Sequence, residues 1–281
     1  VTGSGKSFDT GALIEKLASI PVERHRSISF PMIIIDAHGD YVEYARHFAR
    51  ERRDDKRGLG AVGAITRFVF PNAYRRHQRL RNVEAIEHLE PIGIELDHLG
   101  LRDLAELIVQ YYGGAGSELQ VYGLERILNE LRNKGYTGTE LFTNSYDQLM
   151  SAMKRGKEEL HPAAQGAIIR AISKFKEAED KHLLFSYQSS LRQKDWVDQL
   201  TRQGNIAIID FSAEGAPGVD LPTKQLVVTY LAAVLFDAFA GYKTEGRDRY
   251  LMLLIEEAQN FCPDDSYPVG ASLTKTKLSA I

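Results

Sequence analysis

The chain has 281 residues, of which 43% are hydrophobic and 26% charged, and its formal net charge is −3. This length suits one large α/β domain or two small ones with a substantial buried core, and the composition is that of a soluble globular protein. The charge excludes a chain that is basic throughout, although local basic patches could still bind nucleic acid.

The single cysteine and the apolar runs limit the setting of the protein. Cys262 alone cannot form an internal disulfide framework, which fits a reducing compartment, so we expect a cytoplasmic protein. No apolar run approaches the roughly 18 residues of a membrane span, so we expect no membrane partner. Because the chain starts inside a motif, "VTGSGKS", and stops in an expected helix, we expect a fragment of a longer protein.

The first third of the chain predicts one helix and three strands. Residues Ser7 to Leu17 are expected to form a helix. Three apolar, β-branched runs predict buried strands at Pro31–Asp36, Ala64–Phe70 and Ile92–Asp97.

The middle of the chain, from about Leu101 to Leu200, predicts helices and no strand. "LRDLAELIVQYY" and "ELQVYGLERILNELRNKG" each place apolar residues on one helical face. These residues are Leu101, Leu104, Leu107, Ile108 and Tyr111 in the first, and Tyr122, Leu124, Ile127, Leu128 and Leu131 in the second. Gly135 is expected to close the second helix, and two more helices follow, one with Pro162 in its first turn.

Strand patterns return in the last third. Asn205–Ser212 predicts a strand, "QLVVTYLAAVLFDAFA" a helix apolar nearly all round, and Tyr250–Asn260 a strand ending in two carboxylates. The order predicts an α/β fold in which a mostly parallel sheet is interrupted by an all-helical insert. The expected domains are residues 1–97 and 201–281 for the core and 98–200 for the insert.

The opening "VTGSGKSF" resembles a phosphate-binding loop, G-x-x-x-x-G-K-[S/T], without its first glycine. Glycines let successive backbone N–H groups point at phosphate oxygens, and the following helix adds its positive end. Lys6 would contact the β- and γ-phosphates, and the Ser7 hydroxyl would ligate Mg²⁺. The alternative is a flexible, glycine-rich terminus. The candidate nucleotide-binding residues are Thr2, Gly3, Ser4, Gly5, Lys6, Ser7 and Phe8.

Two carboxylates follow the last strand. A nucleotide hydrolase needs one acid that orders Mg²⁺ and one that polarises the attacking water. Glu256 stands where the first is expected and Glu257 where the second is expected. The alternative is an exposed carboxylate pair that caps a strand.

"IIIDAHGDY" places Asp36, His38 and Asp40 after another strand, at the edge of the sheet where open α/β folds bind ligands. Three interpretations stay open: a metal site, a polar loop near the γ-phosphate or a subunit boundary, and a structural turn around Gly39.

These motifs together resemble the HerA-type branch of the HerA–FtsK ATPases. The shared stretches are "TGSGKS", "IIIDAHGDY", "GNIAIIDFS" and "LLIEEAQNF". The chain departs from the commonest family pattern with Ala37 in place of proline and Gln259 in place of histidine. The resemblance spans nearly the whole chain, although the helical insert matches in pattern only.

The resemblance implies a RecA-like P-loop core of a hexameric, ATP-driven DNA translocase or helicase that uses ATP and Mg²⁺. Lys6 and Glu257 would be catalytic, Ser7 and Glu256 would hold the metal, and Gln259 would sense the γ-phosphate. Family members carry a β-barrel before the P-loop and an arginine finger after the last strand, both outside this chain. They often act with a nuclease in DNA-end processing or anti-phage defence.

Two other functions fit the same residues. The ring could bind ATP mainly to organise and activate a separate effector protein, or the chain could be a conjugation-type or secretion-type ATPase. The basic stretch Arg75–Arg81 could contact DNA, or it could be a solvated surface or a subunit contact.

Overall fold

The computed structural model describes residues 6–18, 29–44, 63–80, 88–113, 117–155, 160–262, 275 and 278. Its contacts divide the chain into two compact units. Unit 1 comprises Val1–Ile92, Ser189–Gly218 and Ala238–Ala258, and unit 2 comprises Gly93–Gln188, Val219–Asp237 and Gln259–Ile281. The domain borders expected after residues 97 and 200 stay a prediction.

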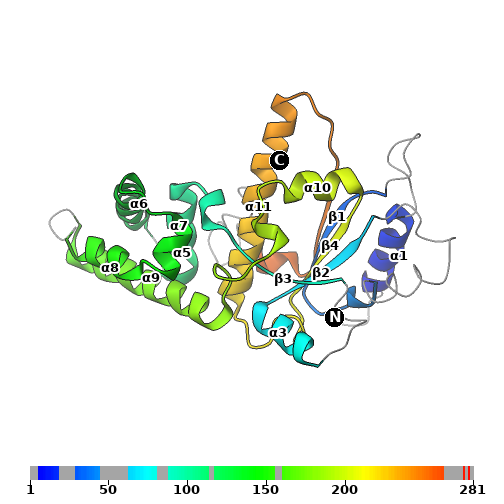
Figure 1. Cartoon of the computed structure of the whole chain (residues 1–281), viewed down its shortest axis with the longest axis horizontal. Helices are drawn as coiled ribbons and strands as arrows, with labels where there is room; N and C mark the ends of the chain where they lie inside the picture. Colours follow the sequence, from blue (N-terminus) through cyan, green and yellow to red (C-terminus); the bar gives the residue numbers. More distant parts are fainter. Residues whose placement is uncertain are drawn as a thin grey trace. The chain divides into compact units, whose positions relative to one another are not determined.

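Unit 1 contains a five-stranded sheet in the order β3-β2-β4-β1-β5 (Figure 1). All four neighbouring pairs are parallel, which confirms the predicted α/β class. The strands are β1 (Met32–Asp36), β2 (Ile65–Val69), β3 (Leu89–Pro91), β4 (Ile206–Asp210) and β5 (Met252–Ile255).

The register aligns the carboxyl ends of β4, β1 and β5 at one edge. Asp36 and Asp210 are the last paired residues of β1 and β4. The backbone N–H of Glu256 donates to the carbonyl of Ile35 at 3.0 Å, so the residue after β5 lies beside the end of β1. Ligands of open parallel sheets bind at this edge, so the strand order brings the predicted site residues Asp36 and Glu256 together there.

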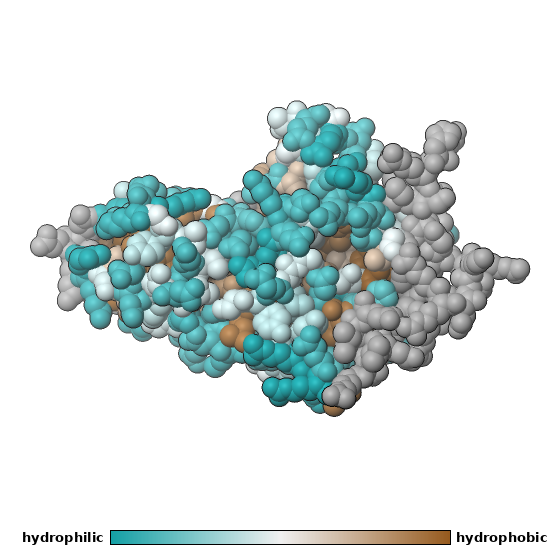
Figure 2. Space-filling model, in the orientation of Figure 1, coloured by the Kyte–Doolittle hydropathy of each residue, from teal (hydrophilic) through white to brown (hydrophobic). Residues whose placement is uncertain are grey.

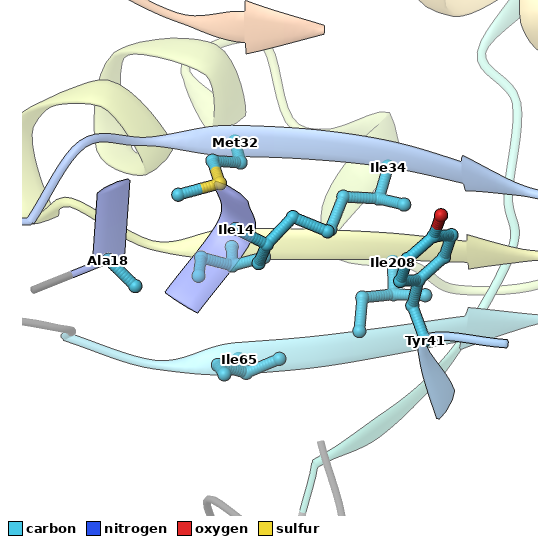
Figure 3. Packing of buried hydrophobic residues seen from close by; sticks show 8 residues of the cluster. Ile14, Ala18, Met32, Ile34, Tyr41, Ile65 and Ile208 are labelled. Carbon is cyan, nitrogen blue, oxygen red and sulfur yellow. The ribbon is translucent and has the colours of Figure 1, made fainter. Parts of the chain in front are cut away.

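Helix α1 (Lys6–Ala18) packs on one face of the sheet (Figure 3). Its Ile14 and Ala18 contact a cluster that includes Met32 and Ile34 of β1. Because side chains alternate along a strand, the intervening Ile33 and Ile35 face the opposite side, and they too are fully buried. Apolar residues on both faces are what a parallel sheet covered on both sides requires.

Among its described residues, unit 1 also holds two short helices and η3 (Ser190–Arg192). Helix α3 (Pro71–Arg79) follows β2 directly and packs through Ala73 against Val69 and Leu89. Helix α10 (Trp196–Gln203) precedes β4 and buries Trp196.

The predicted strand at Ile92–Asp97 is wrong. The strand is β3, which ends at Pro91, and a 3-10 turn, η1, forms at Leu96–His98. The N–H of Ile94 donates to the carbonyl of Leu184 at 2.8 Å, so the backbone leaves the sheet there. The apolar residues Ile92 and Ile94 are therefore buried without being part of a strand.

Unit 2 is helical. It contains α5 (Leu101–Tyr112), α6 (Glu118–Asn133), α7 (Gly138–Thr143), α8 (Tyr146–Arg155) and α9 (Pro162–His182). Its aromatic core joins Phe142 to Phe175 with ring centroids 4.7 Å apart, and Phe175 to Phe185 at 5.1 Å. No strand occurs among the described residues from 101 to 200, which confirms the helical stretch.

The expected helix details agree with the structure except at Tyr122. Gly135 follows α6 with φ of +93°, and Pro162 is the first residue of α9. Tyr122 was expected on the buried face of α6 but is 61% exposed. The buried stripe of α6 is narrower than the apolar stripe in the sequence.

Helix α11 (Leu221–Thr244) contributes residues to both units. By its length and composition this helix could cross a membrane, so the prediction that no apolar run approaches the length of a membrane span is wrong. Of its most apolar stretch, 67% is buried in the protein, and buried core helices of globular proteins can be equally long and apolar.

The 3-10 turn η4 (Ala258–Asn260) follows β5, and its first residue belongs to unit 1.

Candidate functional site

The predicted phosphate loop leads into α1. Lys6 and Ser7 are the first two residues of this helix, as a P-loop requires, and Phe8 after them is 81% exposed. Thr2, Gly3, Ser4 and Gly5 lie outside the described residues, as do the side chains of Lys6 and Ser7. The start of α1 has the positive end of a helix dipole, which favours an anion such as phosphate.

Asp36 closes a tight turn at the end of β1. One of its carboxylate oxygens accepts hydrogen bonds from the backbone N–H groups of His38, Gly39 and Asp40, at 3.3, 2.7 and 3.1 Å. The other accepts from the N–H of Tyr41 at 3.0 Å. Gly39 has φ of +90°, which residues other than glycine rarely adopt. The glycine and the aspartate of "DAHGDY" therefore encode this turn.

The structure favours the structural turn over the metal site for Asp36, His38 and Asp40. Backbone N–H groups donate to both carboxylate oxygens of Asp36, and His38 is mostly exposed. Across the described parts of the chain, no group of three or more His, Cys, Asp or Glu side chains is placed to hold a metal ion.

Glu256 joins the end of β5 to this turn. Its carboxylate accepts a hydrogen bond from the N–H of Ala37 at 3.1 Å. Burial, and then the charge of Asp36, raises the pKa of Glu256. Burial likewise raises the pKa of Asp36, although hydrogen bonds from Tyr41 and Gly39 oppose that shift. A cation beside Glu256 would relieve its repulsion with Asp36, so the single carboxylate of Glu256 is the described side chain at this edge that fits a Mg²⁺ held mainly by phosphates and water.

Glu257 lies beside the same turn, next to His38. Its φ of +49° lies in the left-handed region, which is strained for a residue with a side chain. One of its carboxylate oxygens lies 3.4 Å from Nε2 of His38, and its side chain is 41% exposed. Such strain often accompanies a functional site, and here it directs two successive glutamates to the same loop.

Tyr41 connects Glu256 to α1. The side chains of Glu256 and Thr10 lie close enough to its buried hydroxyl to act on the pKa of Tyr41. Burial, followed by the charge of Glu256, raises the pKa of Tyr41 to about 12, so the hydroxyl stays protonated and remains a donor. Tyr44 makes a parallel link, since its hydroxyl donates to Glu15 of α1 at 3.2 Å. The turn after β1 therefore connects the P-loop helix with the glutamates after β5.

Sequence reasoning missed the buried pair of Arg67 and Asp210. Nε and Nη2 of Arg67 donate to one oxygen of Asp210 at 2.9 and 2.6 Å, and the N–H of Ser212 donates to the other at 2.8 Å. Arg67 is 4% exposed and Asp210 0%. An arginine within the apolar strand "ITRFV" is the signal that could have predicted a buried partner.

Glu214 extends this pair to α3. It lies 3.4 Å from Nη2 of Arg67 and 3.5 Å from Nε2 of His77. Asp210 also adds to the negative potential at Asp36. Charged side chains thus follow the carboxyl edge of the sheet from α3 to β5.

Gln259 lies in η4 and is exposed. Its predicted contact with the γ-phosphate stays a prediction, as do the catalytic and metal-binding roles of Lys6, Ser7, Glu256 and Glu257.

The chain matches a known protein family over most of its length. The family described as "Helicase HerA, central domain" matches residues 1–235, which run from the phosphate loop through most of α11. No curated protein matches the chain. The glutamates after β5 lie beyond the matched residues. Their position at the carboxyl edge therefore supports a candidate site there independently of the family match.

Proposed function

Because the chain belongs to the HerA central-domain family and has a RecA-like core of the P-loop ATPase/helicase type, we propose that it hydrolyses ATP to move DNA. The observation that carries the proposal is the link from α1 to β5. Lys6 and Ser7 begin α1, whose Ile14 packs in one cluster with Tyr41, and the turn that ends at Tyr41 donates the N–H of Ala37 to Glu256.

The residues at this edge divide the work of hydrolysis. Lys6 contributes a positive charge to the β- and γ-phosphates, and the Ser7 hydroxyl and Glu256 hold Mg²⁺. Glu257 orients the attacking water and accepts its proton. The side-chain amide of Gln259 contacts the γ-phosphate. Bound ATP supplies the phosphoanhydride bond that is cleaved, and Mg²⁺ neutralises charge on its phosphates.

The working form in this proposal is a homohexamer in the cytoplasm. Each nucleotide lies between two copies, and an arginine from outside this chain completes the site. DNA passes through the ring, and a nuclease or another effector protein acts with it in DNA-end processing or anti-phage defence. Support for these finer features comes from the family resemblance.

Two variants test the site. We expect Lys6→Ala and Glu257→Gln to lower ATP turnover by about a hundredfold or more, as for loss of a preorganised charge-stabilising group. Lys134→Ala and Glu130→Gln are matched controls, because they remove the same charges from an exposed ion pair at the end of α6. Turnover that stays at the wild-type rate in both site variants would refute the site assignment.

DNA-stimulated turnover tests the motor. A translocase hydrolyses ATP faster when DNA is present. If the full-length protein hydrolyses ATP equally with and without DNA yet activates its effector, the ring is a scaffold and the motor proposal fails.

A further inference from the structure

The exposed face of α3 is strongly basic. Arg75, Arg76 and Arg79 are exposed there, and with Asn72 and Leu80 they line an open groove of about 340 Å³. The space-filling view shows strongly hydrophilic surface at the place of α3 (Figure 2). We call these five residues the α3 face.

Two of these arginines make no ion pair with any described part of the chain. Among the residues that the structure describes, no carboxylate forms an ion pair with the side chain of Arg76 or Arg79. The helix sequence, "PNAYRRHQR", contains no acid. Positive charges this close repel one another, and the most direct relief is a bound polyanion.

The helix is held in a fixed orientation by its other side. Pro71 starts it directly after β2, and Ala73 is fully buried. His77 lies 3.5 Å from Glu214, which in turn contacts the buried Arg67. The basic face is therefore preorganised, at the same edge of the sheet as Asp36 and Asp210, the ends of β1 and β4.

The shape of the site indicates a chain of phosphates. Arg75 and Arg79 lie one helical turn apart, and Arg76 and Arg79 are also neighbours on the helix surface. A guanidinium group binds phosphate through two parallel hydrogen bonds, and three of them along an open groove can contact successive phosphates. Leu80, 68% exposed, adds an apolar contact suited to a sugar or base.

We propose that the α3 face binds the phosphate backbone of DNA without reading its sequence. The choice of DNA rests on the proposed function, whereas the choice of surface rests on the charge and groove of α3. Contacts of this kind release counterions, so binding through them weakens steeply as salt rises.

Fluorescence anisotropy of the full-length protein tests the proposal. The probes are labelled single-stranded and duplex DNA of mixed sequence, titrated at several salt concentrations. We expect Arg76→Gln/Arg79→Gln to weaken binding at least about tenfold and to reduce the slope of log affinity against log salt by roughly 1 to 2. Arg132→Gln/Arg170→Gln, which removes two exposed arginines of α6 and α9, is the matched control and should bind like wild type.

A conservative variant separates charge from helix stability. Arg76→Lys/Arg79→Lys keeps both charges and should retain most of the affinity and salt dependence. ATP turnover without DNA should match wild type in all three double variants, because neither α3 arginine belongs to the proposed hydrolytic site.

Each contrary result has a distinct meaning. If wild type binds DNA and the glutamine variant binds equally well, the assignment of α3 is overturned while the motor proposal stands. If wild type hydrolyses ATP but binds no DNA, both fail. If the glutamine variant keeps its DNA affinity but no longer forms oligomers, the α3 face contacts another copy of the chain, and the proposal is overturned.

Discussion

Asp210→Asn should destabilise unit 1 by about 3 kcal/mol. The substitution keeps the size of the side chain and leaves an oxygen for the N–H of Ser212. It removes the charge that faces Nε and Nη2 of Arg67, a side chain that is 4% exposed. At roughly 4 Å between charge centres and an effective dielectric of about 20, the lost attraction is about 4 kcal/mol.

The remaining partner of Arg67 sets the lower figure. Breaking a buried ion pair costs about 3–5 kcal/mol, because a charge is left without its partner. Glu214 stays 3.4 Å from Nη2 of Arg67, and its side chain is 46% exposed. It offsets part of the loss, which places the expected cost at about 3 kcal/mol.

Tryptophan fluorescence during urea unfolding measures this cost. Trp196 is the only tryptophan, is 4% exposed and belongs to unit 1, so its emission reports on the unit that contains Asp210. Arg67→Met/Asp210→Asn removes both charges and should cost about 1 kcal/mol. Glu245→Gln, which breaks an exposed ion pair with Arg247 in the same unit, should cost less than about 1 kcal/mol. An Asp210→Asn protein as stable as wild type, or a double variant less stable than the single one, would refute the reasoning.

Two further predictions concern Tyr41 and His182. Tyr41→Phe removes the hydroxyl beside Glu256, so kcat for ATP should fall roughly tenfold with little change in KM, since the loss of a hydrogen bond to a charged group costs about 1.5–3 kcal/mol. Tyr44→Phe, which loses only the bond to exposed Glu15, is the control, and equal losses in the two variants would contradict a specific role for Tyr41. Burial lowers the pKa of His182 below its ordinary 6.5, so its contribution to stability is present above pH 6.5 and is lost as pH falls through the lowered pKa. Helical circular dichroism during urea unfolding should therefore show a weaker acid destabilisation in His182→Gln, and an unchanged pH dependence would show that His182 is not its source.

The sequence determined much of the local structure. The apolar β-branched runs placed β1, β2 and β4 to within about two residues, because a buried strand is recognisable from its own residues, and they placed β5 inside a longer predicted strand, Tyr250–Asn260. Gly135 and Pro162 marked the ends of helices through backbone preferences that need no tertiary contact. The order of apolar and polar residues also identified the helical stretch and the carboxylates after β5.

The tertiary structure decided what those elements do together. It placed β1 between β4 and β5, and so brought Glu256 to Ala37, 219 positions away in the chain. It put the hydroxyl of Tyr41 between Thr10 and Glu256, and paired Arg67 with Asp210. It also ended β3 at Pro91, where the apolar pattern continued. Periodicity and propensity are properties of neighbouring residues, whereas strand order and the partners of a buried charge depend on which distant segments meet.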